Sequence, residues 1–223
     1  MPDPVSVAII QESPVFLNLA ASMAKAITLA EKAARAGARV ITFGETWLPG
    51  YPAWLDYCSD VALWDHAPAK EVFARLRQNS IVVPGPETER LAQLAGDHKL
   101  TLVIGVNERV ETGPGNGTLY NSLLIFGPDG RLANHHRKLV PTYTERLVWG
   151  QGDGGGLESV ATPFGRVGGL IAGNIGCRSR ARRCIMPAST STSRSGRPCT
   201  RCTRSRAGTM PSKRDVSFSP REW

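Results

Sequence analysis

Cysteine is nearly absent from the first 171 residues, where Cys58 is the only one. A disulfide framework is therefore excluded for this part of the chain, as in proteins of a reducing compartment. No apolar run approaches the ~18 residues that a membrane helix needs. The start, Met1–Pro4, lacks the charged and apolar regions of a secretory signal. We therefore expect a cytoplasmic protein with no membrane partner.

Acidic residues, leucine and tyrosine are scarce in the last 52 residues. Residues 172–223 contain no Leu or Tyr, only Asp215 and Glu222 as acids, and 11 Arg, 9 Ser, 5 Thr and 4 of the 5 Cys. With one Lys this segment carries a net charge of +10, whereas the whole chain carries +8, so residues 1–171 carry −2. A segment with so little apolar surface and so much positive charge cannot form a buried core. We therefore predict a disordered basic tail from Ala172 onward.

Strand and helix signals alternate through residues 1–171. The β-branched run Val5–Ile10 predicts a buried strand, and Asn18 is placed to cap a helix whose apolar residues recur at helical spacing until about Gly37. Further strands are expected at 40–43, 102–106 and 119–126, helices at 69–77 and 87–95, and hairpin turns at 128–130 and 163–167. This alternation predicts an α/β layered fold.

Three long motifs follow one another along this part of the chain. Residues 43–52 read Phe-Gly-Glu-Thr-Trp-Leu-Pro-Gly-Tyr-Pro, residues 136–142 read His-Arg-Lys-Leu-Val-Pro-Thr, and residues 145–154 read Glu-Arg-Leu-Val-Trp-Gly-Gln-Gly-Asp-Gly. In this order and spacing, from Val5 to Ile171, they resemble the microbial nitrilase branch of the carbon-nitrogen hydrolase family. The resemblance implies a four-layer α-β-β-α sandwich, of which this chain would supply the N-terminal part as a partial domain over residues 1–171.

The resemblance also implies a chemistry. A nitrilase converts a small-molecule nitrile and water to a carboxylic acid and ammonia through a cysteine thioimidate, without a cofactor. That chemistry needs a base for the thiol proton and a cation beside the developing negative charge. Glu45 and Lys138 match the base and the cation, and Glu145 matches a second glutamate that positions the lysine. A buried carboxylate beside a lysine is also a common structural ion pair.

Other side chains near these motifs have two interpretations. Trp47, Tyr51 and Trp54 are candidates for the wall of a substrate pocket, although aromatic residues at these positions could equally belong to the core or to an interface. His135 and His136 could serve as bases or metal ligands. No further His or carboxylate stands at metal spacing, which favours a pair packed at a strand end and no metal site.

The expected nucleophile is missing from the sequence. Nitrilases carry it in a Cys-Trp-Glu motif directly after a strand that ends in Gly-Gly-Leu-Ile, and here Ala172 follows Ile171. The six residues from Ala172 to Cys177 can be translated back into degenerate codons. When the reading frame of these codons is shifted by one base, they permit the sequence Cys-Trp-Glu-His-Trp-Met. Residues 172–223 are therefore interpreted as an out-of-frame translation, and the chain is expected to be inactive.

Rival interpretations of the tail are weaker. A nucleic-acid-binding arm would use the arginines on phosphates, but the tail lacks interleaved aromatic residues, so only nonspecific binding is expected. Cys199 and Cys202 form one proper zinc pair, whereas Cys177 and Cys184 are too far apart to complete a site. Cys177 lies five residues beyond the expected nucleophile, and catalysis is sensitive to misplacement by about 1 Å.

The function classes that stay open differ in their product or partner. An amidase or a cyanide-hydrating enzyme would share the motifs, and a basic-tailed nucleic-acid-binding protein would use only the tail. Relatives assemble as homo-oligomers, an assembly that this shortened chain could lose.

Overall fold

A mixed sheet of five strands organises the residues that the computed structural model describes, which are 4–171. The strands are β1 (Val7–Ile9), β2 (Val40–Thr42), β3 (Thr101–Arg109), β4 (Leu119–Phe126) and β5 (Leu132–Arg137), in the spatial order β1-β2-β3-β4-β5. β1, β2 and β3 run parallel, and β4 and β5 return antiparallel. A separate hairpin of β6 (Val160–Thr162) and β7 (Gly165–Val167) follows. The expected α/β class is confirmed.

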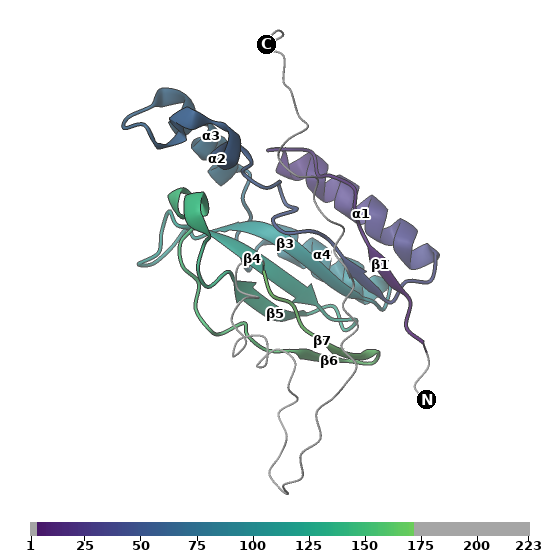
Figure 1. Ribbon diagram of the computed structural model, residues 1–223. Coiled ribbons are helices and arrows are strands. Elements are labelled where there is room, and N and C mark those ends of the chain that lie inside the picture. Colours follow the sequence, from purple (N-terminus) through teal and green to yellow (C-terminus); the bar gives the residue numbers. More distant parts are fainter. Residues whose placement is uncertain (1–3, 172–223) are drawn as a thin grey trace, which may run out of the picture. The chain divides into compact units, whose positions relative to one another are not determined.

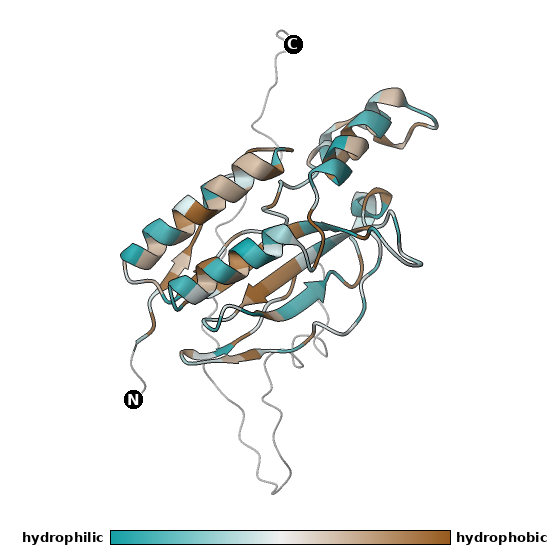
Figure 2. Ribbon diagram, turned by 180° about the vertical axis from the view of Figure 1, so that it is seen from behind, coloured by the Kyte–Doolittle hydropathy of each residue, from teal (hydrophilic) through white to brown (hydrophobic). Residues whose placement is uncertain are grey.

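Helices provide the crossovers between the parallel strands. α1 (Leu19–Arg35) joins β1 to β2, and α2 (Trp54–Tyr57), α3 (Ala67–Gln78) and α4 (Pro86–Asp97) lie between β2 and β3. Figures 1 and 2, seen from opposite sides, show α1 and α4 against the same face of the sheet. Two short 3-10 turns, η1 (Ser59–Ala62) and η2 (Tyr143–Leu147), complete the elements. None of the helices in residues 4–171 is long and apolar enough to cross a membrane.

Helix α1 begins where the sequence predicts. The Asn18 side chain accepts a hydrogen bond from the Ala21 amide at 3.0 Å and so satisfies one of the free donors of the first turn. Met23, Ala26 and Ala30 lie on one face of the helix and are buried. Their burial fixes α1 against the sheet, since an amphipathic helix gains its stability from this packing.

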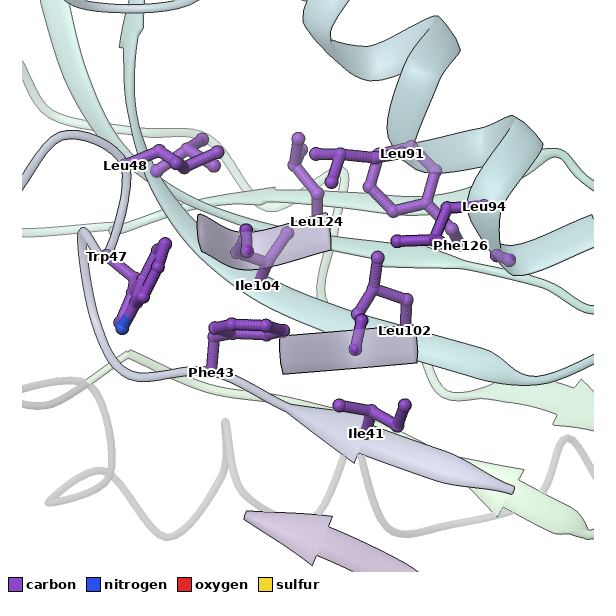
Figure 3. Close-up of a cluster of buried hydrophobic side chains, with 14 of the residues drawn as sticks. Ile41, Phe43, Trp47, Leu48, Leu91, Leu94, Leu102, Ile104, Leu124 and Phe126 are labelled. Carbon is purple, nitrogen blue, oxygen red and sulfur yellow. The ribbon is translucent and has the colours of Figure 1, made fainter. Parts of the chain in front are cut away.

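The main core lies between the sheet and these helices. Figure 3 shows Leu91 and Leu94 of α4 packing over Phe126 and Leu124 of β4. Leu102, Ile104 and Val106 of β3 point to the same side because side chains alternate along a strand. Full burial of one such side chain stabilises the fold by roughly 1.5–3 kcal/mol.

Two expectations for the elements are corrected. Val5–Ile10 was expected to form a buried strand, but β1 is an edge strand in which Val7 is 56% and Ile9 71% exposed. Only Ala8 and Ile10 pack against the core, since an edge strand with helices on one side buries alternate residues. Second, α2 and η1 fill a stretch for which the sequence predicted no helix. The predicted hairpin at 163–167 is confirmed, with Gly165 at φ +117°.

The expectations for the tail fall outside the described residues. They concern its predicted disorder, Ala172 at the position of the nucleophile, Cys177, and the possible zinc pair of Cys199 and Cys202.

Candidate active site

Glu45 lies on a loop that bulges out of the sheet at the end of β2. The Phe43 amide donates to Val103 O at 2.9 Å, and the Leu48 amide donates to Gly105 O at 3.2 Å. Residues 44–47 therefore bulge out between two consecutive hydrogen bonds from this stretch to β3. A Cβ atom at Gly105 would lie 2.8 Å from Glu45 Cα and would collide with Gly44 O. Because Gly105 has no side chain, the backbone of Glu45 can pack directly against β3.

Lys138 is buried directly after β5. Its amide donates to Asn121 O on β4 at 2.8 Å, and its side chain is only 2% exposed. Its Nζ donates to Glu145 Oε1 at 2.9 Å and to Glu45 Oε1 at 3.2 Å, and lies 2.7 Å from Glu145 Oε2. The lysine thus brings together two carboxylates that are 100 residues apart in sequence. A charge this deeply buried is tolerated because it is paired on both sides.

Glu145 is held by the turn that carries it. It lies in η2, where its Oε2 accepts a hydrogen bond from the Thr142 amide at 2.6 Å. Tyr51 O–H donates to its Oε1 at 3.1 Å. Burial and then the negative charge of Glu145 raise the pKa of Tyr51 well above its usual range, because both disfavour a phenolate. Tyr51 therefore keeps its proton and acts as a donor to Glu145.

Two buried asparagines, which the sequence analysis missed, complete the arrangement. Asn121 Nδ2 donates to Glu45 Oε1 at 2.7 Å, so that this oxygen takes two donors while Oε2 has no hydrogen bond from residues 4–171. Asn107 Oδ1 accepts from Trp149 Nε1 at 2.9 Å, and its Nδ2 donates to Gly50 O at 3.0 Å. An asparagine inside an apolar strand is the signal that could have revealed them, since buried amides need partners.

A second polar network lies on the opposite face of the same strands. Glu108, 1% exposed, accepts hydrogen bonds from Ser122 Oγ at 2.6 Å and from Arg137 Nε at 3.1 Å, and its Oε2 lies 2.7 Å from His135 Nε2. Burial would raise the pKa of Glu108, but the hydrogen bonds from His135, Arg137 and Ser122 lower it to about 2. This Glu108 network therefore contains a carboxylate that is ionised at neutral pH.

The site and the network alternate residue by residue along the strands. Side chains of consecutive strand residues point to opposite faces of a sheet. The adjacent pairs, site residue first, are Asn107 and Glu108 in β3, Asn121 and Ser122 in β4, and Lys138 and Arg137 at the end of β5.

Comparison with known proteins places this arrangement in a family. The sequence profile described as carbon-nitrogen hydrolase matches residues 6–185. The chain belongs to the carbon-nitrogen hydrolase family. The nitrilase resemblance of the three motifs is thereby confirmed, and the family consists of hydrolases that act on carbon-nitrogen bonds.

Individual carbon-nitrogen hydrolases agree. An aliphatic nitrilase from Sinorhizobium fredii (strain HH103) is 44% identical over 165 residues, which are 74% of this chain and 51% of that protein. A bifunctional nitrilase/nitrile hydratase from Lupinus angustifolius is 40% identical over 75% of this chain and 46% of its own length. The chain therefore spans about half the length of the curated relatives it matches.

A solved structure shows the same fold. Nit3 of Saccharomyces cerevisiae, a member of branch 10 of the nitrilase superfamily, matches with a TM-score of 0.57 at 20% identity, over 79% of this chain and 58% of that one. The described sheet with helices on one face therefore belongs to the nitrilase-like fold expected from the motifs.

The three aromatic residues expected near the substrate have different surroundings in this carbon-nitrogen hydrolase. Trp47 is 4% exposed and packs edge-on against Phe43 at 4.9 Å in the core (Figure 3). Its Nε1 donates to Glu12 O. Tyr51 contacts Glu145, as described. Trp54 lines a cavity between α2 and α3 that none of the three charged site residues lines. The structure thus brings Tyr51 alone of the three into hydrogen-bonding contact with these charged residues.

The two histidines point to opposite faces of the sheet. His135 joins the Glu108 network, whereas His136 is fully buried with neither ring nitrogen hydrogen-bonded by residues 4–171. Burial, and then the neighbouring His135, lower the pKa of His136, so its ring is neutral near pH 7. Residues 4–171 contain no group of three potential ligands that could hold a metal ion.

Proposed function

We propose that this chain derives from an enzyme that hydrolyses a small nitrile to a carboxylic acid and ammonia. The observation that supports this most directly is Lys138 Nζ held between Glu145 and Glu45 Oε1, at distances of 2.7–3.2 Å. A fixed cation beside a carboxylate with one free oxygen is what covalent attack on a carbon-nitrogen triple bond requires. The relatives' names, aliphatic nitrilase and nitrilase/nitrile hydratase, favour the same substrate class.

Each charged residue has one task in the proposed reaction. Glu45 Oε2 takes the proton of a cysteine thiol as the sulfur attacks the nitrile carbon, and the nitrogen is protonated to give a thioimidate. Water then adds to the carbon and ammonia leaves, giving a thioester, which a second water hydrolyses to the acid and the free thiol. Lys138 stabilises negative charge during the additions, and Glu145 holds Lys138 in place. Asn121 orients Glu45 by occupying Oε1.

This particular chain is proposed to lack activity. Ala172 stands where the family resemblance expects the nucleophile, and its methyl group cannot attack a nitrile. We attribute residues 172–223 to a net loss of one base, or gain of two, near the codons for Ile171 and Ala172. The shifted frame would restore Cys-Trp-Glu at this place.

Two experiments test the proposal. Ammonia release from several nitriles is measured with the chain as written, and no release above a vector control is expected; clear turnover would refute the requirement for a nucleophile at position 172. The gene is also resequenced across the same codons from an independent DNA preparation. A corrected reading frame should yield an active nitrilase. A corrected and folded enzyme that turns over no nitrile would refute the proposed reaction.

Product analysis of the corrected enzyme separates the related activities. Acid with ammonia identifies a nitrilase, and amide identifies a nitrile-hydrating relative, an alternative that the bifunctional relative favours. Turnover of amides but not of nitriles would identify an amidase. The same preparation, measured by light scattering, tests whether the corrected enzyme forms a homo-oligomer and the present chain does not.

The net charge of +10 in residues 172–223 favours one non-enzymatic alternative. Nonspecific binding to nucleic acid would show as DNA retention that falls steeply with salt and disappears when residues 172–223 are deleted.

A further inference from the structure

The backbone of Lys138 is held at the point where β5 leaves the sheet. β5 ends at Arg137, and the Lys138 amide donates the next hydrogen bond, to Asn121 O at 2.8 Å. On the other side of this chain segment, the Gly152 amide donates to Lys138 O at 2.9 Å. The two carboxylates that receive the lysine side chain lie instead on loops, in the bulge at 44–47 and in η2. The link between Arg137 and Lys138 therefore connects the lysine directly to a strand.

Arg137 is fixed on the opposite face of the sheet. Its Nε donates to both carboxylate oxygens of Glu108 at 3.1 Å, and its Nη2 contacts Oε1. Its guanidinium also lies over the ring of Tyr120, 4.2 Å from the ring centre. A planar guanidinium that contacts both oxygens of a carboxylate and stacks on an aromatic ring has little freedom to rotate. Arg137 is therefore fixed in orientation as well as in position.

The ion pair spans three strands. Glu108 lies in β3 and Arg137 in β5, and Ser122 of the intervening β4 donates to Glu108 Oε2 at 2.6 Å. The Glu108 side chain is only 1% exposed, so solvent screens the attraction little. The ends of β4 and β5 are thus tied to β3 directly behind the residues Asn121 and Lys138 of the candidate site.

We propose that Glu108 and Arg137 are positioning residues for the reaction, because their ion pair fixes the backbone from which Lys138 reaches between Glu45 and Glu145. The inference rests on the proposed function for the role of Lys138. A lysine carries its charge on a flexible four-carbon stem, so a small rotation of the backbone displaces Nζ. A misplacement of about 1 Å can slow catalysis by roughly 100-fold.

Acetylation of Lys138 tests this role in the chain as written, without any catalysis. N-acetoxysuccinimide modifies accessible amines, and the peptide 112–145, released by cleavage after glutamate, contains Lys138 as its only lysine. Lys70, whose side chain is 67% exposed, serves as the internal reference. In the parent chain, we expect Lys138 to react no faster than the global unfolding equilibrium, measured with urea, allows. In Glu108→Gln it should react roughly tenfold or more faster than the variant's own unfolding equilibrium allows, because local displacement exposes the amine.

Two further variants separate positioning from stability. Glu111→Gln breaks the exposed pair with Arg109 and should leave the acetylation of Lys138 unchanged. The double variant Glu108→Leu, Arg137→Met replaces the buried pair by apolar side chains, a change that often preserves stability. We expect the folded double variant to keep the fast acetylation of Lys138, since the contact between guanidinium and carboxylate is gone. Acetylation as slow as in the parent chain, in either folded variant of Glu108, would overturn the proposal.

Kinetics of the frame-corrected enzyme supply the second measurement. Glu108→Gln and the double variant should each lower kcat by roughly 10–100-fold and change KM by less than about twofold, because both residues lie on the face away from the reacting groups. A folded variant with the parent kcat, or with only KM altered, would show that the pair is purely structural and would overturn the proposal. Failure of the proposed function would appear differently. The corrected enzyme would then turn over no nitrile, while acetylation of Lys138 in the chain as written would still depend on Glu108.

Discussion

Removing the charge of Glu108 should destabilise the fold in a strongly pH-dependent way. The pKa of this carboxyl falls from 4.5 to about 2 in the folded chain, which corresponds to about 3 kcal/mol of stability above pH 4.5 or so. Because the folded pKa is the lower one, this contribution is present at neutral pH and is lost as the pH falls through 4.5 toward 2. Glu108→Gln keeps the shape but not the charge, and leaves Arg137 without its buried partner.

Urea unfolding followed by tryptophan fluorescence measures this effect. We expect the variant to be less stable than the parent chain by about 3 kcal/mol near pH 7, and the difference to vanish toward about pH 2, where the parent Glu108 is also uncharged. Other carboxylates titrate in both proteins and cancel in the difference. A difference that stays constant over this pH range would refute the reasoning.

Glu111→Gln provides the matched control. Glu111 pairs with Arg109 at 3.0 Å, but its side chain is 49% exposed. Solvent and salt screen such a pair, so the control should change stability little and show no comparable dependence on pH.

Four other substitutions test the surroundings of the candidate site and the cap of helix α1. Gly105→Ala should destabilise the fold by about 1–3 kcal/mol because its Cβ would meet the bulging loop, whereas Gly44→Ala, with nothing within 4 Å of its Cβ, should be tolerated; thermal melting compares the two. Asn18→Ala should cost about 1 kcal/mol through loss of the helix cap, and a change below a few tenths by urea unfolding would contradict this role. Asn107→Leu should cost about 1–3 kcal/mol, since the Trp149 N–H loses its buried acceptor; an unchanged urea midpoint would mean that water replaces the amide.

Local signals predicted most of the fold. The helix after Asn18 and the strand at 119–126 were predicted because a cap, a helical apolar repeat and an apolar stretch followed by a turn signal are local properties. The exposed strand β1 was mispredicted as buried because a sequence does not show which strand stands at the edge of a sheet. The elements α2 and η1 are too short for a helical repeat of apolar residues to be recognised in the sequence.

The candidate site was only partly predictable. The resemblance pointed to Glu45, Lys138 and Glu145, but periodicity alone could not bring together residues 100 positions apart. Asn121 and Glu108 were missed, although a polar residue in an apolar strand signals a partner across the sheet. Trp47 could not be assigned from the sequence, because an aromatic residue in a glycine-rich loop could belong to the core or to a pocket. Its contacts with Phe43 and Glu12 in the structure decide between the two.

The alternation of site and network residues along β3, β4 and β5 has a consequence for single-codon deletions. Loss of one residue from the middle of β4 would carry Asn121 to the helix side and Ser122 to the side of Glu45. Glu45 would lose its amide donor and Glu108 its hydroxyl in one event. In a deletion scan, this stretch of β4 should therefore tolerate point substitutions far better than the removal of any one residue.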